Sequence, residues 1–457
     1  MKHLLLFLLT ILLFSCRKDD DYAPVIPDAD QRIYAGGQTT VFESGFLSFG
    51  IPAPNLNSTN LDIHLAGDKQ FEATFVSAPS PIHPGLGSQF NNTSCIACHP
   101  RDGRTNFPSD INNFSGFFLR ASIPGTDAHG GPKPVPGFGL QLANQTLFGK
   151  QPEVQFAVTY IDKPVTFKDG VVVTLKKPVY SVTDTYIPMP DNAVFSPRLA
   201  PPVFGLGLLE AITEEDILLK QDINDLDGDG ISGKANYVWN PETQSIALGR
   251  FGWKANTPTV LTQTAGAYNN DMGITNPLFP TESSYGQTNG DNLDDDPEIS
   301  QEILDQVALY CRTLAVPAAR NLDDSEVILG YELFEKAKCS ACHTPKHITG
   351  KFPEIPAISN QTIYPFTDML LHDMGDDLAD GRQDFLANGN EWKTRPLWGI
   401  GLTNTVNIHT NFLHDGRAKS IEEAILWHGG EAENSQEFYT NLSKSDRDAL
   451  IAYINSL

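Results

Sequence analysis

The 457-residue sequence predicts a mainly α, loop-rich protein built from two tandem units. Three observations support this fold class. The pattern Cys-x-x-Cys-His occurs twice, at 95–99 and 339–343. Helical apolar stripes flank the second copy. The 37 glycines and 32 prolines indicate long stretches of loop, as expected where a chain wraps a cofactor.

The two Cys-x-x-Cys-His motifs predict covalently bound haem. Two thiols one helical turn apart reach the two vinyl groups of one porphyrin, and the following histidine then lies beneath the iron. A redox dithiol does not need that histidine, and a zinc site needs a second close cysteine pair. The sequence therefore predicts two haem c groups. Their expected ligands are Cys95, Cys98 and His99 for the first, and Cys339, Cys342 and His343 for the second.

The second unit, residues 321–457, is expected to be helical at both ends. Asp323-Asp324-Ser325 offers a capping residue for an amphipathic helix that delivers the chain to Cys339. Leu450 and Ile454 belong to an apolar stripe that continues to the last residue. An opening and a closing helix around a haem motif resemble the cytochrome c fold, so this unit is predicted to be a C-terminal cytochrome c domain.

The first unit, residues 36–320, is predicted to be an N-terminal cytochrome c-like haem domain with insertions. Apolar residues alternate over 154–160 and again over 171–175, on either side of Asp169-Gly170, which predicts a β-hairpin insertion. Near its end, an apolar helical face over 299–314 includes Cys311. We expect Cys311 to be a buried, unreactive packing residue, with a regulatory thiol as the alternative.

The N-terminus predicts export. Residues 1–16 contain an apolar run too short to span a bilayer and end in Leu-Phe-Ser-Cys, which resembles a bacterial lipoprotein box. Cys16 would then be lipidated and attach the protein to a membrane, with residues 17–35 as an acidic tether. The alternative is an ordinary cleaved signal peptide. Both readings predict an exported protein, periplasmic or on the outer surface of a bacterial cell envelope.

The formal net charge of −24 argues against a nucleic-acid partner. It favours a basic soluble partner, such as a small redox protein steered by opposite charge and acting as electron donor. Plain solubility explains the charge equally well.

A short acidic segment predicts a calcium site. Asp225-Leu226-Asp227-Gly228-Asp229-Gly230 matches the start of a calcium loop, in which oxygens at alternating positions converge and glycine permits the sharp turn. The twelfth position is Asn236 and not glutamate, so the loop departs from the EF-hand pattern. A simple acidic turn is the alternative. The predicted ligands are Asp225, Asp227, Asp229, the carbonyl of Ile231, and Asn236.

Several longer segments resemble known families. Residues 412–417 (Phe-Leu-His-Asp-Gly-Arg) and 420–425 are similar to the C-terminal haem domain of bacterial di-haem cytochrome c peroxidases and their methylamine-utilisation relatives. Residues 204–212, 249–254 and 271–275 are similar to bacterial di-haem oxidoreductases, which are also labelled peroxidases or thiol oxidoreductases. The resemblance covers nearly the whole mature chain.

This resemblance implies a division of labour between the haems. The N-terminal haem would bind peroxide at an open or openable position, and the C-terminal haem would pass electrons. The position of the sixth ligand of the C-terminal iron is most nearly that of His428, where relatives usually have methionine or tyrosine. His372 and Met374 are competing ligands, and a histidine bonded to a haem propionate is the alternative for each histidine.

The distal side of the N-terminal haem is less defined by the sequence. Met272, His129 and His83 are candidate iron ligands. Glu210 is the candidate acid–base group, with His129 as a second catalytic candidate. Trp253 or Trp398 could relay electrons between the haems. Each of these residues also has a structural reading, as core packing, loop or solvent-facing side chain.

The sequence thus predicts an exported, membrane-tethered di-haem oxidoreductase enzyme that reduces hydrogen peroxide or a related oxidant. A second hypothesis is a pure electron carrier in which both irons have six protein ligands. A third is peroxide-dependent oxidation of a protein or thiol substrate.

Overall fold

A computed structural model gives the structure of residues 25–284, 286–291, 293 and 295–457. The predicted signal peptide, the lipidation site Cys16 and residues 17–24 of the predicted tether lie outside the described residues. The second half of that tether is packed on the protein. Ile26 is buried in an apolar core, and a short helix, α1 (Ala29–Arg32), follows it.

The fold is not mainly α. Helices account for 29% of the chain and strands for 20%, and the strands are distributed over many small sheets. The described residues form six two-stranded sheets and one four-stranded sheet. The mainly α prediction was wrong because most of these strands have only two to four residues, too few to show an alternating pattern. Two cytochrome c-like helical domains are not apparent in this mixed architecture.

The remaining helices are short to medium in length. None of those in the described ranges has the length and apolar character needed to cross a membrane. The helices that follow α1 are α2 (Ser58–Glu72), α3 (Cys95–Cys98), α4 (Leu206–Ala211), α5 (Glu214–Leu218), α6 (Val260–Met272), α7 (Gln301–Thr313), α8 (Ser325–Lys336), α9 (Cys339–Cys342), α10 (Thr403–Asn407), α11 (Ile421–Trp427), α12 (Glu433–Asn441) and α13 (Lys444–Ser456).

The four-stranded sheet contains β3 (Phe117–Thr126), which pairs with β4 (Pro132–Lys133), β5 (Gln141–Leu142) and β9 (Val194–Leu199). The two-stranded pairs are β1 (Thr40–Val41) with β12 (Val316–Pro317), β2 (Gln89–Phe90) with β6 (Gln145–Thr146), β7 (Val154–Thr166) with β8 (Val172–Thr185), β10 (Tyr237–Asn240) with β11 (Ser245–Leu248), β13 (His347–Ile348) with β14 (Thr362–Ile363), and β15 (Leu371–Asp373) with β16 (Glu391–Lys393).

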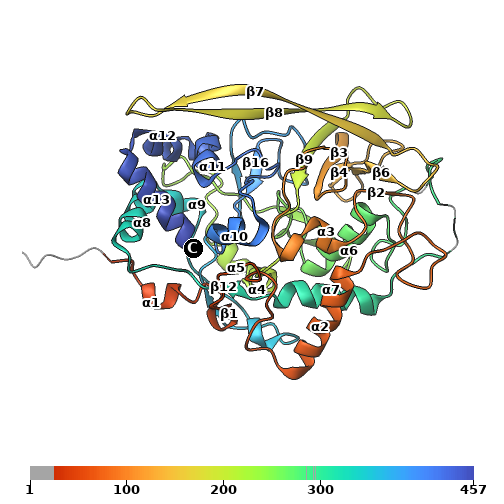
Figure 1. Cartoon of the computed structure of the whole chain (residues 1–457), viewed down its shortest axis with the longest axis horizontal. Coiled ribbons are helices and arrows are strands. Elements are labelled where there is room, and N and C mark those ends of the chain that lie inside the picture. The colour runs from red at the N-terminus through yellow and green to blue at the C-terminus, as the bar shows by residue number, and fades with distance from the viewer. Residues whose placement is uncertain (1–24, 285, 292, 294) are drawn as a thin grey trace, which may run out of the picture.

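The hairpin predicted in the first unit is present as β7 and β8 and is longer than expected. Figure 1 shows it lying across the top of the molecule, over both the N-terminal and the C-terminal parts. At its base, Val154 and Phe156 pack in a core with β3 and β9. Near its tip, Phe167 is buried in the C-terminal core, and the Arg447 guanidinium lies 4.0 Å from the centre of its ring. The hairpin therefore connects the two parts of the fold.

Each Cys-x-x-Cys-His motif follows a helix that is fixed in the same way. A Cβ on Gly67 of α2 would lie 2.1 Å from the carbonyl oxygen of Gln306 in α7. A Cβ on Gly330 of α8 would lie 2.0 Å from the carbonyl oxygen of Ala449 in α13. Glycine at these two positions lets the paired helices touch through their backbones. One helix of a close-packed pair therefore precedes each motif in the chain.

The proposed boundary at residue 320 is not tested by these contacts and stays a prediction. The largest apolar core lies mainly in the first unit, but it also includes Ile355, Met369 and Trp398 from the second. The two motifs thus belong to parts of the chain that share buried surface.

Candidate functional site: two pockets at the cysteine motifs

The C-terminal motif presents a histidine in a defined tautomer. Cys339 and Cys342 are the first and last residues of α9, and His343 follows directly. Nδ1 of His343 donates a hydrogen bond to the carbonyl of Phe366 at 3.0 Å, which leaves Nε2 as the unprotonated nitrogen. Burial lowers the pKa of His343 to about 4, so the ring is neutral at pH 7. A neutral imidazole with an oriented Nε2 is the form that binds iron.

The N-terminal motif repeats this arrangement. Cys95 and Cys98 are the first and last residues of α3. Nδ1 of His99 donates a hydrogen bond to the carbonyl of Pro201 at 2.7 Å. Burial lowers the pKa of His99 to about 4. The same tautomer is therefore fixed at both motifs by an unrelated stretch of backbone. The sequence motif alone does not reveal this hydrogen bond, which orients the histidine ring.

Both motifs open into large, mainly apolar pockets. The C-terminal pocket encloses about 1750 Å³ and the N-terminal pocket about 1310 Å³, their open mouths included. The donor set of each motif and the size of each pocket fit a haem bound through two thioethers and one histidine. In the C-terminal pocket, apolar walls are supplied by Leu397, Phe412 and Ile425 among others.

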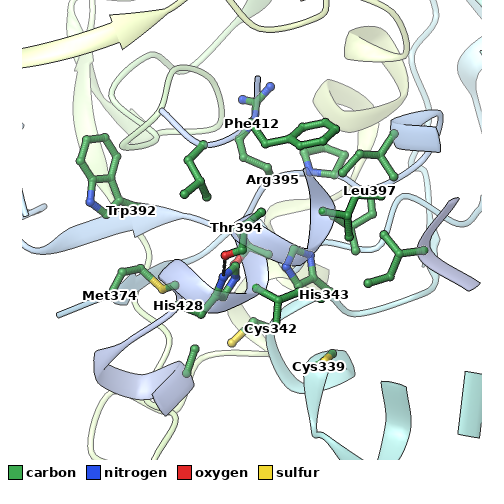
Figure 2. Close-up of a pocket in the computed structure, with 18 of the residues that line it drawn as sticks. Cys339, Cys342, His343, Met374, Trp392, Thr394, Arg395, Leu397, Phe412 and His428 are labelled. Atoms are coloured by element: carbon green, nitrogen blue, oxygen red, sulfur yellow. Dashed lines mark hydrogen bonds between the residues drawn. The ribbon is translucent and has the colours of Figure 1, made fainter. Parts of the chain in front are cut away.

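His428 lies in the C-terminal pocket with His343. It follows α11 directly, and its Nδ1 donates to the carbonyl of Ala424 at 2.7 Å, so its Nε2 is also left unprotonated. Figure 2 shows the two imidazoles as neighbours, with Met374 farther along the same pocket. The structure therefore places His428 and Met374, two candidates for the sixth ligand of the C-terminal iron, in the same pocket as the motif histidine.

His372, the third candidate, also lines this pocket, but both of its ring nitrogens are engaged. Nδ1 lies 2.7 Å from Oε2 of Glu431, and Nε2 lies 2.8 Å from Oδ2 of Asp368. Burial opposes its charge, but the two carboxylates outweigh this and hold the pKa of His372 well above its ordinary value. In this arrangement its nitrogens donate protons to carboxylates and have no lone pair for iron.

The N-terminal pocket has a different lining. One side is a face of α6, with Val260, Gln263 and Thr264 followed by Met272 at the end of the helix. His99 is the only histidine among the described residues that line the pocket, and Met272 is the only methionine. Cys311 lines it as well. It is 5% exposed, which confirms that Cys311 is buried, and this burial raises the pKa of its thiol to about 12.

Trp253 lines both pockets. Its Nε1 donates to the carbonyl of Leu199 at 3.0 Å, and the side chain is 7% exposed. The guanidinium of Arg104 lies 5.2 Å from the ring centre, and that of Arg395 lies 4.8 Å from it. Trp398, the other relay candidate, lines the C-terminal pocket only. Trp253 is thus the tryptophan that the structure places between the two motifs.

The remaining catalytic and ligand candidates lie outside both pockets. Glu210 pairs with Arg312 and does not belong to either lining. His129 is exposed and stacks on Trp239, with ring centroids 3.9 Å apart. His83 packs against Phe75, also away from both linings. The roles suggested for these residues have no support from their positions.

The predicted calcium loop is only partly assembled as expected. Carboxylate oxygens of Asp222, Asp225 and Asp227 lie within 4.8 Å of one another. Asn236 is instead buried, and its amide donates to the carbonyls of Lys254 and Asp384. Asp222, three positions before the loop motif, was not predicted as a ligand; its Oδ2 accepts the backbone N–H of Leu226 at 2.7 Å.

Comparison with known proteins agrees with the geometry of these pockets. No significant relative was found among curated proteins. Residues 30–457 match the family described as "Di-haem oxidoreductase, putative peroxidase". That match covers both cysteine motifs, both pockets and nearly the whole chain. The chain therefore belongs to the di-haem oxidoreductase family.

Proposed function

We propose that this protein is an exported c-type di-haem enzyme that reduces hydrogen peroxide, or a related small oxidant, in its N-terminal pocket. Electrons would enter through the C-terminal pocket from a small redox protein. One haem would be attached to Cys95 and Cys98 and the other to Cys339 and Cys342. Membership of a di-haem oxidoreductase family supports the cofactor count and the class of reaction.

The difference in histidines between the pockets carries this proposal. His343 and His428 both line the C-terminal pocket, whereas His99 has no second histidine among the described residues around it. If His343 and His428 both bound the C-terminal iron, no position would be left for substrate, and this haem would be suited to electron transfer. If His99 were the protein ligand of the N-terminal iron and Met272 did not bind it, a position would remain at which a small oxidant could bind.

Residues of the N-terminal pocket are suited to a small polar substrate. Haem iron, when bound, supplies the electrons that reduce peroxide and two protons to two water molecules. Asn256, Gln263 and Thr264 line the pocket and offer hydrogen bonds that can orient peroxide and water. Trp253 lines both pockets, so its aromatic ring could shorten the path of electrons from one haem to the other.

The charge and the N-terminus support the rest of the proposal. A net charge of −24 favours approach of a basic electron donor. Lipidation at Cys16 would tether the enzyme to a bacterial envelope membrane. Calcium bound by Asp222, Asp225 and Asp227 would fix the loop that ends at Ile231, a residue of the C-terminal pocket.

Met272 supports one alternative function. Its side chain is buried in the N-terminal pocket, and a thioether is a known haem ligand. If its sulfur ligates the N-terminal iron in every redox state, both irons are six-coordinate. The protein is then an electron carrier without peroxide turnover.

Electron paramagnetic resonance of the ferric and partly reduced protein separates these two functions. We expect one low-spin signal from the iron between His343 and His428, and one high-spin signal that hydrogen peroxide consumes. Met272→Leu should leave the high-spin signal in place. Two low-spin signals that persist in each redox state and do not respond to peroxide would overturn the enzyme proposal in favour of the carrier.

A further inference from the structure

Arg395 is a cation that faces both pockets. It lies two residues after β16 and belongs to the linings of the C-terminal and the N-terminal pocket alike. Burial lowers the pKa of its guanidinium to about 10, so it is charged at pH 7. Within the described part of the chain, no carboxylate lies at ion-pair distance from it; its close neighbour is the ring of Trp253. A buried charge without a counter-ion is costly and indicates that an anion belongs nearby.

The position of Arg395 in the pocket identifies that anion. Figure 2 shows Cys339 and Cys342 at one end of the C-terminal pocket and Arg395 toward the other. The vinyl groups and the propionates of a porphyrin occupy opposite edges of the ring. A haem attached to these cysteines through its vinyl groups therefore directs its carboxylates toward the end that holds Arg395.

We propose that Arg395 is a shared counter-ion that binds a propionate carboxylate of each haem. This inference rests on the proposed function only in requiring both haems. The planar guanidinium has five N–H donors in a fixed fork, enough to bind two carboxylates from different directions. One residue would then set part of the electrostatic environment of both irons and hold the two carboxylate edges on either side of Trp253.

Other cations in the pockets belong to one pocket each, and they provide matched controls. Arg120 lines the N-terminal pocket only, and Arg104 lines the C-terminal pocket only. Among the described residues, carboxylates influence Arg104 and Arg120 only through space, without a hydrogen bond to either guanidinium. Arg198 and Arg382, which also line the N-terminal pocket, are already paired with Asp384. Arg395 is the cation whose removal should affect both haems.

A potentiometric titration of the full-length haem-loaded protein tests the proposal, with each haem followed by its own optical and paramagnetic signals. Removal of a positive charge near a haem favours the ferric state, so Arg395→Gln should lower the midpoint potentials of both haems. Arg120→Gln should lower only the N-terminal potential, and Arg104→Gln only the C-terminal one. Haem content, measured as pyridine haemochrome, should stay at two per chain in every variant.

A conservative variant covers the case in which Arg395→Gln does not fold. Arg395→Lys keeps the charge but loses the fork, so the propionate bending bands of both haems should shift in resonance Raman spectra while the potentials move less. A change confined to one haem, or to neither, would overturn the shared role. Because neither measurement uses peroxide, that result would leave the proposed peroxide reduction standing. Absence of haem from the unmodified protein would overturn both proposals.

Discussion

Oε1 of Glu210 lies 3.0 Å from Nη2 of Arg312 and also accepts the backbone N–H of Val260 at 2.8 Å. Both side chains are largely buried, at 7% and 17% exposure. This carboxylate therefore joins α7 to Val260, the first residue of α6 and a residue of the N-terminal pocket, although Glu210 itself does not line that pocket. Its position favours a structural role over proton transfer to substrate.

Glu210→Gln is accordingly expected to weaken the fold. The substitution leaves the Arg312 guanidinium buried without a counter-ion, which costs about 3–5 kcal/mol of the free energy of unfolding. Urea unfolding followed by circular dichroism measures this loss. The double variant Glu210→Gln/Arg312→Met should recover part of it. A variant as stable as the unmodified protein that no longer reduces peroxide would instead assign Glu210 to proton transfer.

Replacement of His428 tests the ligand of the C-terminal iron. His428→Met should raise the midpoint potential of the C-terminal haem, because a thioether stabilises ferrous iron relative to imidazole. The shift should lie well within the roughly 0.8 V range that axial ligands span. Optical potentiometry measures it, and Met374→Leu is the control from the same pocket. An unchanged potential in His428→Met, together with a changed one in Met374→Leu, would assign the ligand to Met374.

Calcium should stabilise the protein through the loop that contains Asp222, Asp225 and Asp227. A ligand that binds only the folded state adds about 2.7 kcal/mol at a hundred times its dissociation constant. Differential scanning calorimetry with and without Ca²⁺ measures the resulting rise in melting temperature. Asp222→Asn and Asp225→Asn should reduce that rise, whereas Asp191→Asn, at an exposed site outside the cluster, should not. An equal rise in all variants would place any calcium elsewhere.

The sequence predicted the local features that depend on short-range chemistry. The cofactor class followed from five-residue motifs, and the β7–β8 hairpin followed from alternation around Asp169-Gly170. Cys311 was correctly expected to be buried, because it falls on the apolar face of a strongly amphipathic helix. In each case, the residues that support the prediction are close in sequence to the feature predicted.

Features that depend on distant parts of the chain were not predictable in this way. The carbonyls that orient His99 and His343 belong to Pro201 and Phe366. Every residue has a backbone carbonyl, so the sequence does not show which ones will accept these hydrogen bonds. Nothing in the sequence around Arg395 shows that its side chain lines two pockets. The small sheets were missed because two-residue strands such as β1 and β12 are created only when distant segments meet.

Glu153 provides a pH-dependent test of the fold. Its carboxyl group is 2% exposed and accepts hydrogen bonds from the N–H of Ala143 and the amide of Gln287, each at 2.7 Å. Burial raises the pKa of Glu153 from 4.5 to about 8. Between those values the folded protein keeps a proton that the unfolded chain has released. The contribution of Glu153 to stability is therefore complete below about pH 4.5 and is lost as the pH rises through about 8.

Glu153→Gln imitates the protonated carboxyl group at every pH. The variant should gain stability relative to the unmodified protein as the pH rises from about 5 to about 8, by at most about 1.4 kcal/mol per pH unit. Urea unfolding at several pH values measures this difference, and Glu326→Gln, at an exposed helical position, is the control. A difference that stays constant with pH would mean that Glu153 is ionised in the folded protein, and the two hydrogen bonds would then have to hold a buried carboxylate.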